Sequence, residues 1–414
     1  MLIFFYIVFG NFFNFNFLER LPIKLAEFFS LFLFVLFALR IFYKKIKGVS
    51  LQNRTIWLWL LIAFVSSTIN FVVNKYGLTD YIYGISYIFR LIHLVLLIRI
   101  TEFFIEDTEI GKTKLLNFVI NCYMIVCIIG FIQLLLFPTA IDWYTFASKF
   151  GGTWADPDPH QGRLLSTYHD PNYLASVIII PTGLIISKIM IKNEFKNIEN
   201  SDLIKLSVLL ITLVLTESRT SLVGFAILMI ALILYYGLNK KIPTQVYIAL
   251  LALIFVGILF VMFGDVEVIN KISNVKTDDS AKHRFDSWNE AFSIFKKNFV
   301  YGIGYNLYAP YNEMMTAQGV VNTSSYGLDS SVLFAFVTTG FFGGIVFLKI
   351  MCDIIKAKIY NYAYIGVKAI LLASIIMSFF NNLLFYTLWI FPFAIVVFAA
   401  KTMDKEINNE FQQI

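Results

Sequence analysis

Charged residues are scarce in this chain of 414 residues. Asp, Glu, Lys and Arg make up only 14% of it, whereas hydrophobic residues make up 58% and the mean hydropathy is +0.74. A water-soluble fold cannot cover that much apolar surface, so most of the chain is expected to lie in lipid. The sequence therefore predicts an all-α, polytopic integral membrane protein.

Cysteine and histidine are also rare, with three and four residues in the whole chain. Cys122, Cys127 and Cys352 have neither the pattern of a disulfide framework nor metal-ligand spacing. No other cluster of His, Cys and Asp has that spacing, so we expect no metal and no other cofactor. The net charge of +6 is spread over loops, which argues against nucleic-acid binding and indicates a topology signal with some attraction to anionic lipid.

Apolar runs long enough, or nearly long enough, to cross about 30 Å of hydrocarbon recur along the chain. We predict about twelve transmembrane helices in a single domain, residues 1–414. The first run lacks a basic n-region and a small-residue cleavage site, so we interpret it as a retained membrane helix. The predicted runs are 2–17, 25–43, 55–73, 81–100, 115–137, 172–191, 203–217, 220–238, 242–263, 331–350, 363–380 and 383–400.

The basic residues set the expected orientation. If the N-terminus is cytoplasmic and the sides alternate, most of the 33 lysines and arginines lie inside, close to helix ends. Both termini are then cytoplasmic, and the two larger loops, 138–170 and 264–330, are extracytoplasmic. The tip of the hairpin at 216–221 lies on that same face, where any chemistry is expected.

The longer loop contains a helical pattern at about 284–300. Phe285, Trp288, Phe292, Phe295 and Phe299 follow one another at steps of three and four residues, while charged residues fall elsewhere. This pattern predicts an amphipathic helix that lies on the membrane or caps the bundle.

Three arginines come from separate segments of the predicted outer face: Arg163, Arg219 and Arg284. Guanidinium groups bind phosphate oxygens in pairs and stay charged at any relevant pH. A site that binds a diphosphate and stabilises it as a leaving group needs such an arrangement. The alternative is that each arginine anchors a helix end or pairs with a neighbouring carboxylate, such as Glu217 or Asp286.

Two groups near predicted helix starts are candidate proton acceptors. Asp329 precedes the run at 331–350, and His169 precedes the run at 172–191. A carboxylate at the rim of a partly dry site can accept a proton from a sugar hydroxyl, and the pKa of histidine suits the same task. The alternative for Asp329 is that it caps the following helix.

Arg90 lies in the middle of the run at 81–100, three residues before His93. An arginine at membrane depth indicates a functional site by default. Glu27, in the second run, is either its structural counter-ion or a substrate contact.

Four short blocks, taken together and in this order, resemble the O-antigen ligase/polymerase family of bacterial membrane glycosyltransferases. The blocks are Gly162–Thr167 with Asp170–Ala175, then Thr216–Thr220, then Arg284–Trp288 with Gly302–Tyr305, and Asp329–Ser331 with Thr339–Gly343. The resemblance covers roughly residues 160–350.

The resemblance implies a metal-independent transferase of the bacterial cytoplasmic (inner) membrane that works on glycans linked to polyprenyl diphosphate. The diphosphate role of the family's arginines carries over to Arg163, Arg219 and Arg284. Ligase members usually carry histidine where this chain has Asp329 and Ser330. We therefore expect a repeat-unit polymerase of O-antigen, capsule or exopolysaccharide, with Asp329 as the catalytic base.

His169, Asn172, Trp288, Tyr305 and Arg90 are expected to bind the substrate, although belts of Trp and Tyr also anchor proteins at membrane interfaces. Expected partners are the lipid-linked oligosaccharide and membrane lipid, with a chain-length regulator and a flippase as further candidates. Three other functions remain open at this point: ligase-type transfer to another acceptor, a lipid-linked oligosaccharide flippase, and a non-catalytic assembly component.

Overall fold

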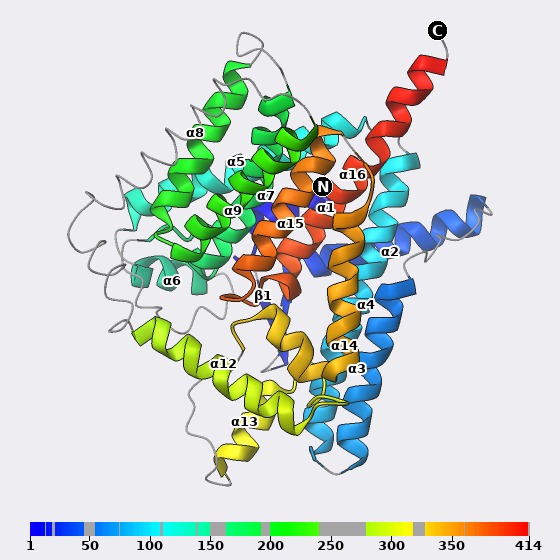
Figure 1. Cartoon of the computed structure of the whole chain (residues 1–414), viewed down its shortest axis with the longest axis vertical. Helices are drawn as coiled ribbons and strands as arrows, with labels where there is room; N and C mark the ends of the chain where they lie inside the picture. Colours follow the sequence, from blue (N-terminus) through cyan, green and yellow to red (C-terminus); the bar gives the residue numbers. More distant parts are fainter. Residues whose placement is uncertain are drawn as a thin grey trace.

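The computed structural model describes residues 1–12, 14–18, 21–44, 54–73, 75–107, 111–137, 140–149, 163–191, 199–239, 279–317, 328–359 and 361–412. Within them the regular secondary structure is helical apart from one antiparallel hairpin of β1 (Asn14–Leu18) and β2 (Leu21–Lys24). The helices (Figure 1) are α1 (Leu2–Phe4), the π-helical turn η1 (Phe5–Phe9), α2 (Leu25–Lys44), α3 (Arg54–Val72), α4 (Leu78–Asp107), α5 (Lys112–Leu136), α6 (Ala140–Ser148), α7 (Pro171–Ile191), α8 (Asn200–Leu215), α9 (Arg219–Asn239), α12 (Asp279–Lys297), α13 (Tyr308–Ala317), α14 (Ser331–Lys356), α15 (Tyr362–Met377), the 3-10 turn η3 (Leu383–Phe385) and α16 (Thr387–Gln412).

Five of these helices are long and apolar enough to cross a membrane, namely α3, α5, α7, α9 and α14. Shorter apolar stretches lie in α2, α15 and α16. Lipid-facing surface is evident on α2, which projects from the bundle in Figure 1 and exposes Phe28, Phe32 and Val35. These features confirm the predicted all-α polytopic membrane protein. All but two of the predicted runs coincide with helices, and the run at 242–263 lies outside the described residues.

The prediction of a membrane helix at 2–17 is wrong. The helical turns end at Phe9, and Gly10 turns the chain at a φ of 51° toward the hairpin. A Cβ at Gly10 would lie 2.7 Å from the carbonyl oxygen of Thr167, so only glycine fits there. Tyr6 and Ile7 are almost completely buried. The run is apolar because it packs into the bundle, and not because it crosses lipid.

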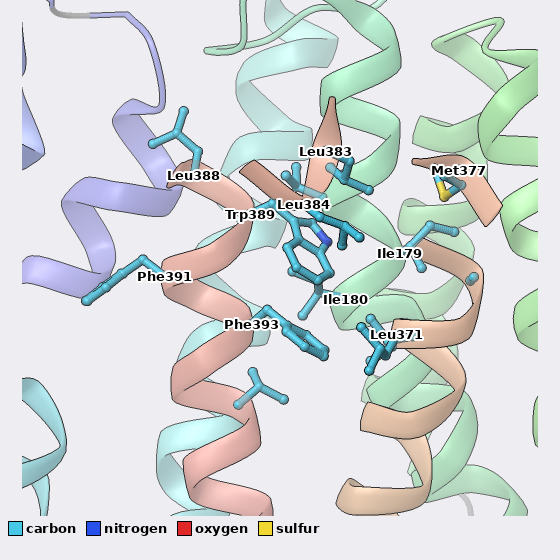
Figure 2. Packing of buried hydrophobic residues seen from close by; sticks show 14 of the residues in the cluster. Ile179, Ile180, Leu371, Met377, Leu383, Leu384, Leu388, Trp389, Phe391 and Phe393 are labelled. Atoms are coloured by element: carbon cyan, nitrogen blue, oxygen red, sulfur yellow. The ribbon is translucent and has the colours of Figure 1, made fainter. Parts of the chain in front are cut away.

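The centre of the bundle is α7. Within its membrane-length stretch, 83% of the residues are buried, far more than in the other four long apolar helices. Glycines let α15 approach closely, because Gly183 packs against Ile370 and Gly366 against Ser187. Figure 2 shows part of the buried core around α7, α15 and α16: Ile179, Ile180, Leu371, Met377, Leu383, Leu384, Leu388, Trp389, Phe391 and Phe393. Phe391 points away from α7 and α15 and stacks on Tyr6 of η1, with ring centroids 4.4 Å apart.

Helix α14 is broken at Gly340, where φ is 71° and ψ is −172°. The segment after α12 fills the break with its own backbone. The amides of Ile303 and Gly304 donate to the carbonyl oxygens of Val337 (2.9 Å) and Thr338 (3.0 Å), and the amide of Phe341 donates to that of Phe299 (2.8 Å). The carbonyl groups released by the break are therefore bonded again by a segment distant in sequence.

Candidate functional site

One end of the bundle gathers segments that are far apart in the sequence. We call it the loop end, and define it by residues 163–170, 216–218, 299–307, 328–330 and 378–386. Backbone hydrogen bonds connect these segments or residues next to them. The amide of Leu164 donates to the carbonyl oxygen of Leu215 (3.0 Å), and the amide of Ser331 donates to the carbonyl oxygen of Ser378 (2.8 Å). Helix α12 crosses the bundle obliquely near this end, with α13 beyond it (Figure 1).

Residues 163–170, at the end of the first predicted loop, 138–170, fold into the bundle. The side-chain carbonyl of Gln133, in α5, accepts hydrogen bonds from the amides of Leu165 (2.9 Å) and Ser166 (2.7 Å). The indole of Trp143, in α6, donates to the carbonyl oxygen of Ser166 at 3.0 Å. Ser166 has a positive φ of 53°, which these contacts hold in place. The segment is therefore a fixed platform at the loop end.

Arg163 connects this platform to the tip of the hairpin between α8 and α9. Its Nε donates to the carbonyl oxygen of Thr216 at 2.7 Å, and its Nη2 lies 3.4 Å from Oδ1 of Asn172. The same oxygen of Asn172 accepts from the hydroxyl of Ser218 at 2.7 Å. Asn172, predicted to bind substrate, thus cross-links the first two motif blocks. The next residue after Ser218 is Arg219, which opens α9 and is exposed.

The third arginine, Arg284, lies in the first half of α12, and its side chain is outside the described residues. The helix itself begins five residues earlier than predicted, at Asp279. Its bundle-facing side is formed by Ser287, Ala291 and Ile294, whereas Phe285 remains 55% exposed. The predicted aromatic face is therefore split, with part of it left facing outward.

Asp329 is an exposed residue immediately before α14. The residue that caps the helix is Ser330, whose hydroxyl accepts from the amide of Leu333 at 3.4 Å. The carboxylate of Asp329 interacts electrostatically with Tyr173, at the start of α7, and with Tyr308, at the start of α13. Asp329 therefore lies near the starts of α7, α13 and α14, and it is not the cap that the sequence suggested as the alternative.

Comparison with known proteins agrees with this geometry. Residues 205–348 match the family model described as O-antigen ligase. The chain carries an O-antigen ligase domain. Enzymes of this family are membrane proteins of the glycosyltransferase type. A search of curated proteins finds no match to this chain.

The O-antigen ligase domain holds Arg219, Arg284 and Asp329 but begins after Arg163 and His169. The structure connects both of these residues to the loop end. His169 is exposed, its ring stacks on Tyr173 with centroids 5.2 Å apart, and its Nδ1 is hydrogen-bonded to Asn11. Tyr173 in turn packs on Tyr386, between α15 and α16, with centroids 4.5 Å apart.

The two aromatic residues predicted to stack on sugars lie in different surroundings. Trp288 is half-buried near the loop end, with its ring 5.6 Å from that of Phe380. Tyr305 is only 4% exposed and packs edge-on against Trp59, with centroids 5.5 Å apart. This burial argues against a sugar contact for Tyr305. The sequence could not reveal this, because the break in α14 draws the segment at 299–307 into the core.

Arg90 is also occupied by protein. Its Nε and Nη2 bind the two carboxylate oxygens of Glu27 at 2.7 and 2.8 Å. His93 accepts or donates a hydrogen bond at Ser30, 2.8 Å away, and stacks on Phe34. These contacts favour the structural counter-ion interpretation of Glu27, so Arg90 joins α4 to α2 and is not grouped with the loop-end arginines.

The sequence reading missed a set of polar residues between α12 and α13 of the O-antigen ligase domain. Ser287, Tyr308 and Asn312 are all at least nine-tenths buried, and Glu290 is half-buried one helical turn from Ser287. Burial, together with the nearby carboxylate of Glu290, raises the pKa of Tyr308 to about 12, although hydrogen bonding of its hydroxyl to Asn312 and Ser287 acts in the opposite direction. Burial also raises the pKa of Glu290 above its ordinary value. The only sequence signal was a polar stripe on an amphipathic helix.

Proposed function

We propose that the protein polymerises lipid-linked polysaccharide repeat units, by moving a glycan from polyprenyl diphosphate to a sugar hydroxyl at the loop end. The observation that carries this proposal is the meeting of all four motif blocks at one end of the bundle. Arg163 bonds the hairpin tip that leads into Arg219, and the segment after α12 fills the break in α14. Asp329 lies near the starts of α7 and α13.

The proposed reaction is a single displacement. A hydroxyl oxygen at the non-reducing end of an incoming unit attacks the anomeric carbon of the chain linked to the lipid. The bond between that carbon and the phosphate oxygen breaks, its electron pair leaves with the diphosphate, and the anomeric configuration inverts. Asp329 takes the hydroxyl proton, and the arginines stabilise the charge that develops on the diphosphate.

Orientation supports the same proposal. Basic residues are most frequent at the helix ends away from the loop end, which favours an extracytoplasmic loop end and a cytoplasmic C-terminus in the bacterial cytoplasmic membrane. Because residues 2–17 do not form a membrane helix, the alternation no longer assigns the N-terminus to the cytoplasm. A chain-length regulator and a flippase remain proposed partners.

Substitutions at two adjacent residues separate chemistry from capping. If Asp329 is the base, Asp329→Asn lowers the rate of transfer about 10²–10⁴-fold while the fold remains intact. Ser330→Ala removes the cap and lowers the free energy of unfolding by about 1 kcal/mol, with a much smaller effect on the rate. The assay is polymerisation of purified lipid-linked repeat units by protein reconstituted in vesicles, with unfolding followed separately. Near-normal polymer from Asp329→Asn removes the base assignment, and a collapse with His169→Gln moves it to the histidine.

The family's printed description favours a second candidate, ligase-type transfer of the glycan to a different acceptor. The two candidates differ in product. The reconstituted polymerase makes a ladder of longer lipid-linked chains from one substrate, whereas a ligase leaves that substrate unchanged until another acceptor is added.

A further inference from the structure

Four polar side chains of α12 and α13 lie close together, and they do not fully satisfy one another by hydrogen bonding. The groups are the hydroxyls of Ser287 and Tyr308, Oε1 of Glu290, and both amide atoms of Asn312. All of these atoms are buried, and none makes a hydrogen bond of normal distance and angle within the described part of the chain. Asn312 and Ser287 are close enough to the Tyr308 hydroxyl to act as weak hydrogen-bond partners and lower its pKa, but that contact does not satisfy all of these atoms. A buried polar atom left in that state costs about 1–3 kcal/mol, so one such atom is tolerable and five in one region require an explanation.

Helix geometry brings these atoms together. Ser287 and Glu290 are three residues apart on α12, and Tyr308 and Asn312 are four apart on α13, so each pair occupies one helix face. The Tyr308 hydroxyl is close enough to Asn312, Ser287 and Glu290 to be influenced by each of them, and it also interacts with Asp329. The four residues, which we call the amide pocket, therefore border the space faced by the proposed base.

The chemistry of the amide pocket suits a sugar. It offers a carboxylate, an amide with both a donor and an acceptor, and two hydroxyls. Pyranose rings present hydroxyl groups that each donate and accept. Trp288 follows Ser287 on the same helix and is held against Phe380, which gives the pocket an aromatic neighbour. A diphosphate is a poor match, since the pocket contains no described cation and one carboxylate.

We propose that the amide pocket binds the acceptor sugar, holding the non-reducing end of the incoming unit beside Asp329. This proposal rests on the proposed function for the identity of the reaction, but the binding step is measured separately. Glu290 and Asn312 are the specificity-determining residues, and they act as binding groups and not in proton transfer.

The test uses the full-length protein in nanodiscs and the repeat-unit oligosaccharide released from its lipid by mild acid. Binding is followed by saturation-transfer NMR titration. Loss of one neutral hydrogen-bonding partner weakens binding about tenfold, so we expect Asn312→Ala and Glu290→Gln each to raise Kd by at least that factor. Asn289→Ala is the matched control, because Asn289 is an exposed amide on α12, and it leaves Kd unchanged.

A stability measurement separates a binding role from a structural one. If Glu290 is a structural residue, Glu290→Gln destabilises the protein; if it is kept for the sugar, the variant is at least as stable at neutral pH, because an unsatisfied buried carboxylate is removed. Ser287→Ala serves as a second variant in case Asn312→Ala fails to fold. Wild-type Kd values in both Asn312→Ala and Glu290→Gln overturn the amide pocket even where polymerisation is normal. Specific binding with no polymerisation by the wild type supports the pocket and refutes only the proposed function.

Discussion

Replacing Gly340 with alanine tests the break in α14 that arranges the loop end. The residue has φ of 71° and ψ of −172°, a region that residues with a side chain rarely occupy. A Cβ there would also lie 2.2 Å from the carbonyl oxygen of Val300 and 2.9 Å from the amide of Gly302. Both obstacles are backbone atoms, which cannot swing aside as a flexible side chain can.

The magnitude follows from these two effects. Holding a non-glycine residue in such a conformation costs about 1–3 kcal/mol. Forcing an extra methyl group into a packed site costs about 1–3 kcal/mol more. The expected loss in the free energy of unfolding is therefore roughly 2–6 kcal/mol, a large part of a total that is typically about 5–15 kcal/mol.

The measurement is unfolding of the purified protein in mixed micelles, followed by tryptophan fluorescence. Gly111→Ala is the matched control, because a Cβ at Gly111 meets nothing within 4 Å; we expect its effect to stay within about 1 kcal/mol. The two structures of α14, broken or regular, predict changes of opposite sign in the free energy of unfolding. If α14 ran through Gly340 as a regular helix, alanine would stabilise it by about 1 kcal/mol. Stabilisation, or a change no larger than that of Gly111→Ala, refutes the break.

Three further predictions concern charge and orientation. Lysine at Arg163, Arg219 or Arg284 keeps the charge but loses the two-pronged contact with phosphate, so transfer activity falls while membrane levels hold; three normal Lys variants would assign these arginines to anchoring. Burial raises the pKa of Glu290 in the folded state above its unfolded-state value of about 4.3. The stability that Glu290 contributes is therefore fully present below the unfolded-state pKa and is lost as the pH rises through the higher folded-state pKa. Wild type should therefore lose stability relative to Glu290→Gln across mildly acidic pH, and a constant difference between their pH profiles contradicts the burial. Cysteines placed at the exposed residues Ser148 and Glu313, in a chain whose exposed Cys352 is replaced by serine, should react with an impermeant reagent in intact cells; no labelling at either would reverse the orientation.

Hydropathy was sufficient to predict most of the helices, because a membrane span is recognised by length and composition alone. It failed at residues 2–17 for a physical reason. An apolar run that packs against protein has the same composition as one that packs against lipid, and only Gly10 and the asparagines that follow signalled the turn. The same ambiguity hid the core position of Tyr305.

The candidate site was predictable only in part. Arginines near membrane helix ends are conspicuous, so the sequence was enough to name Arg163 and Arg219 as candidates. What the sequence did not contain was the partner of each group. Thr216 offers Arg163 a backbone oxygen, which no residue pattern encodes. Ser330 occupies the N-cap position of α14, for which Asp329 was an equally suitable residue type. In the sequence, Glu290 could not be distinguished from a solvated carboxylate on an amphipathic helix, whereas in the structure it is partly buried.

These partners change what the charged groups near the loop end are able to do. Ser330 provides the capping hydroxyl of α14, so the adjacent Asp329 is not the residue that caps this helix. The break at Gly340, filled by residues 299–304, holds α12 in a fixed relation to the same helix. An exposed carboxylate on a rigid helix start, next to buried polar atoms that lack partners, is an arrangement that costs stability. Such costs are retained where they serve binding or chemistry, which is why the same region carries both the proposed base and the proposed acceptor pocket.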